Sequence, residues 1–195
     1  SGFPTPREQM VPFLALFPDY DILCIDYVGQ GLEHIPQTLL GGFTYKCFGV
    51  DMCATSFGLH DPVDLINVVK EVKKSRSYTH CYGLCLCHSA PIFVNATAME
   101  PQLFEKLLID GCWPSIFQVV RTIARYPSLV CGRQPPRSPC AWITDRDIVQ
   151  NFACYLVEKM AKLKLADIPS VQALFPSISI PVLLFQSRQD CYCSL

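Results

Sequence analysis

Residues 82–91 read Tyr-Gly-Leu-Cys-Leu-Cys-His-Ser-Ala-Pro, an apolar run that passes into a turn and then into a helical pattern. A short and nearly continuous apolar run is typical of a strand that is covered on both faces of a sheet. We expect this strand within residues 78–84 and a helix over residues 91–98. The stretch therefore predicts a strand, a sharp turn and a helix, the unit from which α/β proteins are built.

Three further apolar runs of the same kind, at residues 21–26, 106–110 and 180–185, alternate with helical patterns along the chain. Apolar side chains at helical spacing predict helices over 6–17, from Asp61 (as N-cap) to 72, over 115–125, and from a capping box at Thr144 to residue 163, the longest of them. This alternation predicts an α/β fold with a mostly parallel sheet and helices on both faces.

The composition is that of a single well-packed domain of 195 residues, 50% hydrophobic and 17% charged. The net charge is −1 and no basic tract occurs, so we expect no nucleic-acid partner. The longest apolar runs have six or seven residues, whereas a membrane span needs about 20. No signal peptide is recognisable, so we expect a cytoplasmic protein whose twelve cysteines are mostly buried and reduced.

Three cysteines and one histidine lie close together in the sequence, at Cys81, Cys85, Cys87 and His88. Zinc sites use paired cysteines on loops, whereas this cluster runs from an apolar strand into a turn. We therefore expect no metal and no other cofactor.

Three patterns carry the candidate chemistry. The first is Asp26-Tyr27-Val28-Gly29-Gln30-Gly31, at the end of the first predicted strand. The second is Gly83-Leu84-Cys85-Leu86-Cys87, followed by a helix, and the third is the stretch 180–190, which ends in Asp190. A nucleophile on a sharp strand-to-helix turn projects above the sheet, and small residues two positions on either side let the backbones approach.

In this order, the patterns resemble the motifs of the α/β-hydrolase superfamily. The first four residues resemble a His-Gly-x-Pro segment that supplies an oxyanion donor, with Ser1 in place of the histidine. The second pattern resembles the nucleophile elbow Gly-x-Ser-x-Gly, with Cys85 in place of the serine, as in the dienelactone-hydrolase branch. The third resembles the strand that leads to the acid of the catalytic triad.

The resemblance implies that Cys85 is the nucleophile and that Asp190 orients a catalytic histidine. Backbone amides of Gly2, Phe3 and Leu86 would hold the oxyanion. None of the four histidines stands at the family's position, so the resemblance implies a histidine beyond this chain. It also implies a chain truncated at both ends, which lacks a central strand and tends to aggregate when it is alone.

Two other residues are alternatives for these roles. Residues 87–91 resemble Gly-His-Ser-x-Gly, which would make Ser89 the nucleophile. Asp110, at the end of the third predicted strand, is the alternative acid. Cys85 and Cys87 also form a C-x-C pair, which would suit a redox or acyl-carrier module.

About 70 residues separate the third and fourth predicted strands, far more than a crossover needs. This excess predicts a helical lid over 112–170, inserted into one partial domain that covers 1–195. Trp113, Phe117 and Trp142 would shape an apolar pocket in this lid.

The favoured function is hydrolysis of a small-molecule ester, thioester or lactone. The alternative is an inactive pseudoenzyme or binding protein on the same fold, favoured by the altered elbow and the absent histidine.

Overall fold

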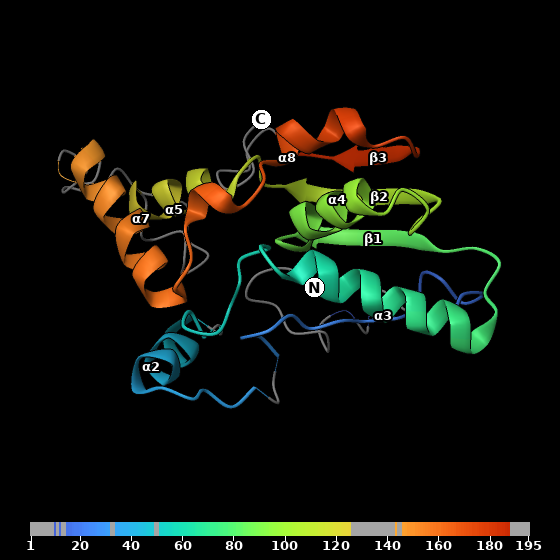
Figure 1. Ribbon diagram of the computed structural model, residues 1–195, viewed down its shortest axis with the longest axis horizontal. Helices are drawn as coiled ribbons and strands as arrows, with labels where there is room; N and C mark the ends of the chain where they lie inside the picture. The colour runs from blue at the N-terminus through green and yellow to red at the C-terminus, as the bar shows by residue number, and fades with distance from the viewer. Residues whose placement is uncertain are drawn as a thin grey trace.

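The computed structural model describes residues 10, 12, 15–31, 34–48, 51–125, 143 and 146–187. The helices in these ranges are α2 (Leu39–Phe48), α3 (Asp61–Arg76), α4 (Ser89–Met99), α5 (Ile116–Arg125), α7 (Asp147–Ala161) and the short α8 (Val171–Leu174), with 3-10 turns at Leu165–Asp167 and Phe175–Ser177 (Figure 1). The strands are β1 (Tyr82–Cys87), β2 (Lys106–Cys112) and β3 (Val182–Phe185). None of the described helices is both long and apolar enough to cross a membrane.

The three strands form a parallel sheet in the order β1-β2-β3, which gives the chain an α/β fold. Leu107 and Ile109 of β2 belong to a buried core. Helix α4 covers this core, with α3 and α8 beside it (Figure 1). On the opposite face, Tyr82 and Phe185 are exposed. Helices were predicted on both faces, and within the described ranges α3, α4 and α8 cover one face, where the sheet core lies.

The prediction of a strand at 21–26 is wrong, because these residues form no strand of the sheet. Ile22 and Leu23 are 42% and 48% exposed, so this run is not packed as a sheet strand would be. Of the other predicted strands, β2 and β3 lie where they were expected, but β1 begins at Tyr82 and continues to Cys87. This later position of β1 moves the strand-to-helix turn along the chain.

Gly83 lets α4 lie directly on β1. A Cβ atom at this position would come 2.4 Å from Leu107 Cδ2 and 2.9 Å from Phe93 Cδ1. Both distances are shorter than carbon atoms adopt in a packed core. The position therefore requires glycine for packing between the strand and the helix.

We expect Gly83→Ala to lower the free energy of unfolding by about 1–3 kcal/mol, because Leu107 and Phe93 must both shift. Urea denaturation followed by circular dichroism measures this change. Gly42→Ala is the matched control, since the nearest atom to its added Cβ is Pro36 Cβ at 3.9 Å. Within α2, this control should be neutral or stabilise by up to about 1 kcal/mol. Equal urea midpoints for Gly83→Ala and the wild type would show that the packing is not tight.

A second, smaller core is built mostly from residues that follow β2 and precede β3 in the chain. It joins α5 and α7 to residues of the loop before α3, and its buried members are Phe57, Trp113, Ile116, Val119, Val120, Cys154, Leu165 and Ile168. Arg121 ties the two helices together by donating to Gln150 Oε1 and pairing with Asp147. The described part of 112–170 is thus largely helical, and its role as a lid stays a prediction.

Some predicted helix ends differ from the observed ones. The N-cap of α3 is His60, and Asp61 is the first helical residue. The Asp61 carboxylate accepts hydrogen bonds from Gly58 N, at 2.7 Å, and from Ser56 Oγ, so it closes the loop before the helix. α7 begins at Asp147 and is one residue shorter than α3, so it is not the longest helix. Most of the predicted helix over 6–17 lies outside the described residues, as does Thr144.

Candidate active site at the turn after β1

The strand-to-helix turn is centred on Cys87. β1 ends at this residue, His88 follows as the N-cap, and α4 begins at Ser89. The backbone of Cys87 has a φ of +52°, in the left-handed region that is uncommon for residues other than glycine. The register between β1 and β2 also shifts between Leu86 and Cys87. The sharp turn therefore lies two residues beyond the predicted one at Cys85.

Cys85 lies inside β1 and points into the core. Its side chain is 1% exposed, and its Sγ donates a hydrogen bond to the carbonyl oxygen of Leu108 at 3.5 Å. Burial raises the pKa of the Cys85 thiol, and the nearby Cys112 raises it further. The prediction that this side chain projects above the sheet is wrong, because Cys85 shares the core-facing side of β1 with Gly83.

Ser89, the alternative nucleophile, holds the turn closed. Its hydroxyl donates to the carbonyl oxygen of Leu86 at 2.9 Å and accepts from the Leu86 backbone N–H at 2.8 Å. Its side chain is buried. The Ser89 hydroxyl and the Leu86 amide, which was predicted as an oxyanion donor, therefore hydrogen-bond to each other and are both occupied within the turn.

Cys87 is half-buried and lies beside an aromatic donor. The indole N–H of Trp113 donates to Cys87 Sγ at 3.1 Å. The N-terminus of α4 comes two residues later, and the partial positive charge of a helix N-terminus favours a thiolate. From the sequence, Cys87 was considered only as the small residue after Cys85 and as half of a C-x-C pair, and not as the nucleophile. Cys85 and Ser89 are nevertheless the small residues that an elbow needs two positions on either side of Cys87.

His88 is completely buried behind this turn. Its ring centroid lies 5.1 Å from that of Trp113 and 6.1 Å from that of Tyr27, the latter in an edge-to-face contact. Burial lowers the pKa of His88 to about 3, so the imidazole is neutral at physiological pH. A base with such a low pKa holds a proton poorly, so His88 is not suited to take the proton of a thiol.

The predicted Asp-x-x-Gly-x-Gly stretch forms a tight turn next to His88. Gln30 N donates to Tyr27 O at 3.0 Å, and the two glycines, Gly29 and Gly31, have φ values of +84° and +90°. Burial raises the pKa of the Tyr27 hydroxyl. Among the residues that the structure describes, the buried side-chain amide of Gln30 has no hydrogen-bond partner, so it is a polar group that a water or a substrate can satisfy.

Of the two candidate acids, only Asp110 falls in the described part of the chain. It lies on β2, opposite Leu86, with an exposed side chain. Asp190, Gly2 and Phe3 lie outside the described residues. The ends of β2 and β3 lie close together, since Cys112 N donates a hydrogen bond to Gln186 Oε1 at 3.0 Å. In the sequence, Asp190 follows four residues after Gln186.

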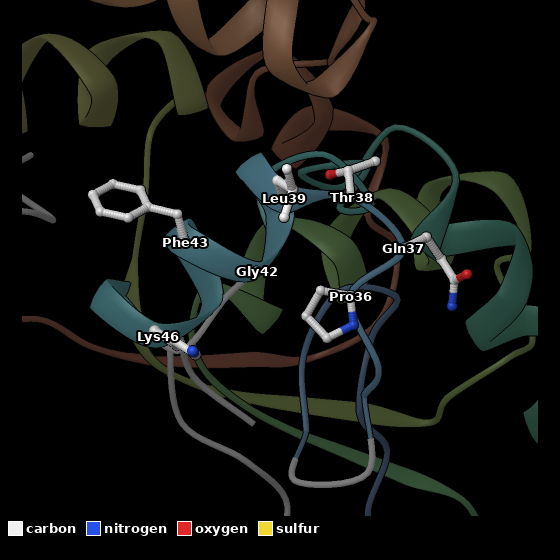
Figure 2. A pocket seen from close by; sticks show the side chains of 7 residues that line it. All are labelled: Pro36, Gln37, Thr38, Leu39, Gly42, Phe43 and Lys46. Carbon is white, nitrogen blue, oxygen red and sulfur yellow. The ribbon is translucent and has the colours of Figure 1, made fainter.

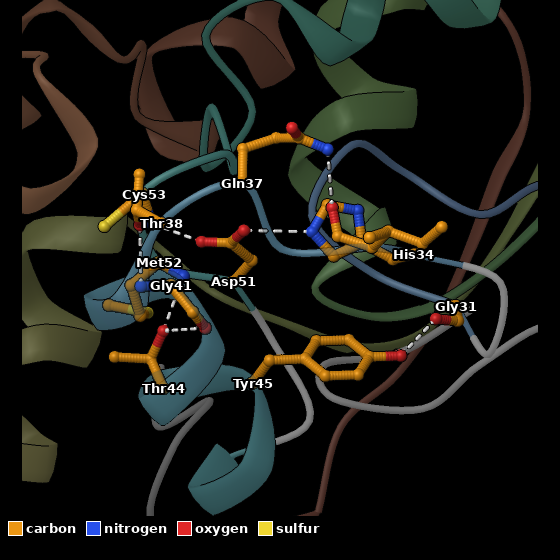
Figure 3. Close-up of polar contacts among 11 residues, drawn as sticks. Gly31, His34, Gln37, Thr38, Gly41, Thr44, Tyr45, Asp51, Met52 and Cys53 are labelled. Atoms are coloured by element: carbon orange, nitrogen blue, oxygen red, sulfur yellow. Dashed lines mark hydrogen bonds and ion pairs between the residues drawn. The ribbon is translucent and has the colours of Figure 1, made fainter.

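Of the other three histidines, two are paired with carboxylates. His34 Nε2 lies 3.0 Å from a carboxylate oxygen of the buried Asp51, and its ring packs beside Tyr45, as Figure 3 shows. This pair ties the segment after Gly31 to residues 51–53. His80 precedes β1, at the opposite end of the strand from Cys87, and pairs with Glu105 at 2.9 Å. His60 caps α3.

A shallow pocket of about 520 Å³ lies over α2, with none of its lining on the strands (Figure 2). It is lined by Pro36, Gln37, Thr38, Leu39, Gly42, Phe43 and Lys46. Leu39 and Phe43 are exposed at its rim. The pocket and the turn at Cys87 are therefore separate features of the protein. Trp142 of the predicted substrate pocket is outside the described residues, and Trp113 packs against His88.

No group of three or more metal-ligating side chains occurs among the residues that the structure describes. A scan against models of protein families finds no match for the chain, and a search of the curated proteins finds none either.

Proposed function

We propose that the chain is a hydrolase of the α/β-hydrolase type that acts on an ester, thioester or lactone, and that Cys87 is its nucleophile. The observation that carries this proposal is the positive φ of Cys87, at a sharp turn between a parallel strand and a helix. A backbone held in a sparsely populated conformation is typical of residues that a fold positions for chemistry. The position of Cys87 at the carboxyl end of β1 agrees with this, since ligands of open parallel sheets bind at that edge.

The surroundings of Cys87 suit nucleophilic attack by a thiolate. The Trp113 N–H and the N-terminus of α4 both stabilise negative charge on the sulfur, so no imidazolium is needed beside it. The sulfur would attack the carbonyl carbon, and the backbone N–H of His88 would face the developing oxyanion. Departure of the alcohol or thiol leaves a thioester on Cys87, and water then releases the acid.

The helical segment 112–170 would cover an apolar acyl group. The small core of this segment, which includes Trp113 and Ile116, packs against the half-buried Cys87. Apolar lining around a few polar groups is the usual character of a small-molecule site. In this proposal Asp190 and Asp110 remain the two candidates for the acid of the catalytic triad.

A thiol-reactive label tests the nucleophile directly. With limiting iodoacetamide, we expect Cys87 to be alkylated before Cys85, because Cys87 is more exposed and its sulfur receives an N–H donor. Peptide mass mapping locates the label, and the hydrolysis of a panel of esters, thioesters and lactones should fall in proportion to labelling. Faster labelling of Cys85 than of Cys87 would contradict the assignment.

A specific observation favours the second candidate, an inactive pseudoenzyme or binding protein. His88, the histidine in contact with the turn, is buried and neutral, and the predicted donor at Leu86 is engaged with Ser89. Under this alternative, the folded protein binds apolar acyl compounds without releasing the acid. Slow alkylation of Cys87 together with saturable binding of an uncleaved ester would decide for the binding protein.

A further inference from the structure

Cys87 and Cys112 face each other across β1 and β2. The two residues are Cα partners in the parallel ladder, at the carboxyl ends of both strands. Adjacent strands lie about 4.8 Å apart. A disulfide requires Cα atoms about 4.4–6.8 Å apart, so the register places this pair within the range that a disulfide can bridge.

Their side chains also share surroundings. Trp113 donates its indole N–H to Cys87 Sγ, while Cys112 Sγ donates to the Trp113 carbonyl oxygen at 3.7 Å. Burial raises the pKa of Cys112 to about 12, and the charge of the neighbouring Cys87 adds to this effect. The half-buried Cys87 is thus the thiol that an oxidant meets first, and Cys112 is the buried thiol behind it.

Cys85 is a poorer partner for Cys87. The two are separated by one residue on the same strand, which places their Cα atoms about 6.6 Å apart, near the upper limit for a disulfide. The Cys85 thiol is also held by the Leu108 carbonyl oxygen. Cys112, across the ladder, is therefore favoured over Cys85, on the same strand, as the disulfide partner of Cys87.

We propose that Cys87 and Cys112 form a reversible disulfide when the protein meets a hydroperoxide. The Cys87 thiolate attacks one peroxide oxygen, the O–O bond breaks, and Cys87 becomes a sulfenic acid as the other oxygen leaves as water or an alcohol. The Cys112 sulfur, giving up its proton, then attacks the Cys87 sulfur, and the S–O bond breaks with loss of water. The two thiols together lose two electrons, which reduce the peroxide, and an added dithiol reverses the change.

Peptide mapping after oxidation tests the disulfide. The full chain is treated with hydrogen peroxide, blocked with iodoacetamide and cut with trypsin, which cleaves after Arg76, Lys106 and Arg121. We expect peptides 77–106 and 107–121 to be linked, and dithiothreitol to separate them. The link should be lost completely in Cys112→Ser and in Cys87→Ser, and kept in Cys85→Ala, the matched control on the same strand.

Fluorescence gives a second readout in a Trp142→Phe background, where Trp113 is the remaining tryptophan. Formation of the disulfide beside its indole should change the emission reversibly in the parent and leave it unchanged in Cys112→Ser or, if that variant does not fold, in Cys112→Ala. A link that persists without Cys112, or separate oxidation of Cys87 with no link, would overturn the inference.

The disulfide does not depend on the proposed function, but its consequence for activity does. If Cys87 is the nucleophile, peroxide should abolish hydrolysis and dithiothreitol should restore it. In Cys112→Ser the Cys87 sulfenic acid has no resolving thiol, so excess peroxide oxidises it to the sulfinic acid, which dithiothreitol does not reduce, and hydrolysis should not recover. Formation of the link in a protein that hydrolyses none of the substrates would support the disulfide and contradict the proposed hydrolase function. Hydrolysis without any link would support the hydrolase function and overturn the disulfide.

Discussion

Replacing Cys87 with alanine is expected to lower kcat/KM for the best ester or thioester by more than about 1,000-fold, because no attacking atom then remains at the turn. The substitution removes a single sulfur from a half-buried position, so the fold should persist. Circular dichroism and the urea midpoint establish this before the rates are compared. An inactive but folded Cys87→Ala protein is the central result that the proposed function requires.

Cys85→Ala and Ser89→Ala distinguish the three candidate nucleophiles. Cys85→Ala should keep the activity and lose about 1 kcal/mol of stability, since it leaves a small cavity under α4. Ser89→Ala should lower stability by about 1–3 kcal/mol, because it leaves the Leu86 amide and carbonyl without their partner in the turn. Retention of full activity by Cys87→Ala, with loss in Cys85→Ala, would return the assignment to the residue that the sequence motif favours.

The buried His88 should make the protein less stable in acid. Its pKa in the folded state is about 3, below the ordinary value of 6.5, so between these values the unfolded chain binds more protons than the folded one. The contribution of His88 to stability is therefore fully present above pH 6.5 and is lost as the pH falls toward 3. The slope is up to about 1.4 kcal/mol for each pH unit.

Urea denaturation of the wild type and His88→Gln between pH 7 and 4.5 measures this contribution as a difference. The wild type should lose stability more steeply than His88→Gln, and His88→Phe serves as a second variant that keeps a ring against Trp113 and Tyr27. Buried Asp61, whose pKa is raised by burial, contributes equally to all three proteins and cancels. Parallel curves for the wild type and both variants would show that His88 titrates normally.

The sheet was predictable because its strands are continuous apolar runs, and β2 and β3 lie at such runs. The failure at residues 21–26 has a physical cause. Their apolar side chains satisfy the local preference for a strand, but a ladder also needs a free edge at the right place, which only the three-dimensional arrangement determines. The exposure of Ile22 and Leu23 is the result.

The position of the turn was missed for a related reason. The motif Gly-x-Cys-x-Cys suggested that Gly83 and Cys87 are the small residues around a nucleophile at Cys85. In the structure, Gly83 is required for the packing of α4 on β1, and the strand continues two residues further. A motif fixes residue types and spacing, whereas the end of a strand depends on its partner strand and on the helix that follows.

Helix α2 was not predicted at all, since Leu39–Phe48 contains two adjacent glycines and several aromatic residues, which have low helix propensity. Tertiary and capping contacts stabilise this helix, because the intrinsic helix propensity of its residues is low. Thr38 Oγ1 accepts a hydrogen bond from Gly41 N at 2.9 Å, and a Cβ on Gly41 would collide with the Asp51 carboxylate. Thr38 as a helix N-cap was the one signal in the sequence that could have revealed this helix.

The division of the protein into two hydrophobic cores has a consequence for how it opens. Cys85 belongs to the sheet core, whereas Cys87, two residues later, packs against the helical core of α5 and α7. Regions of a protein unfold locally as separate cooperative units, each with its own free energy. A transient opening of the helical unit would uncover Cys87 and leave Cys85 protected, so the two neighbouring thiols report on different foldons of one chain.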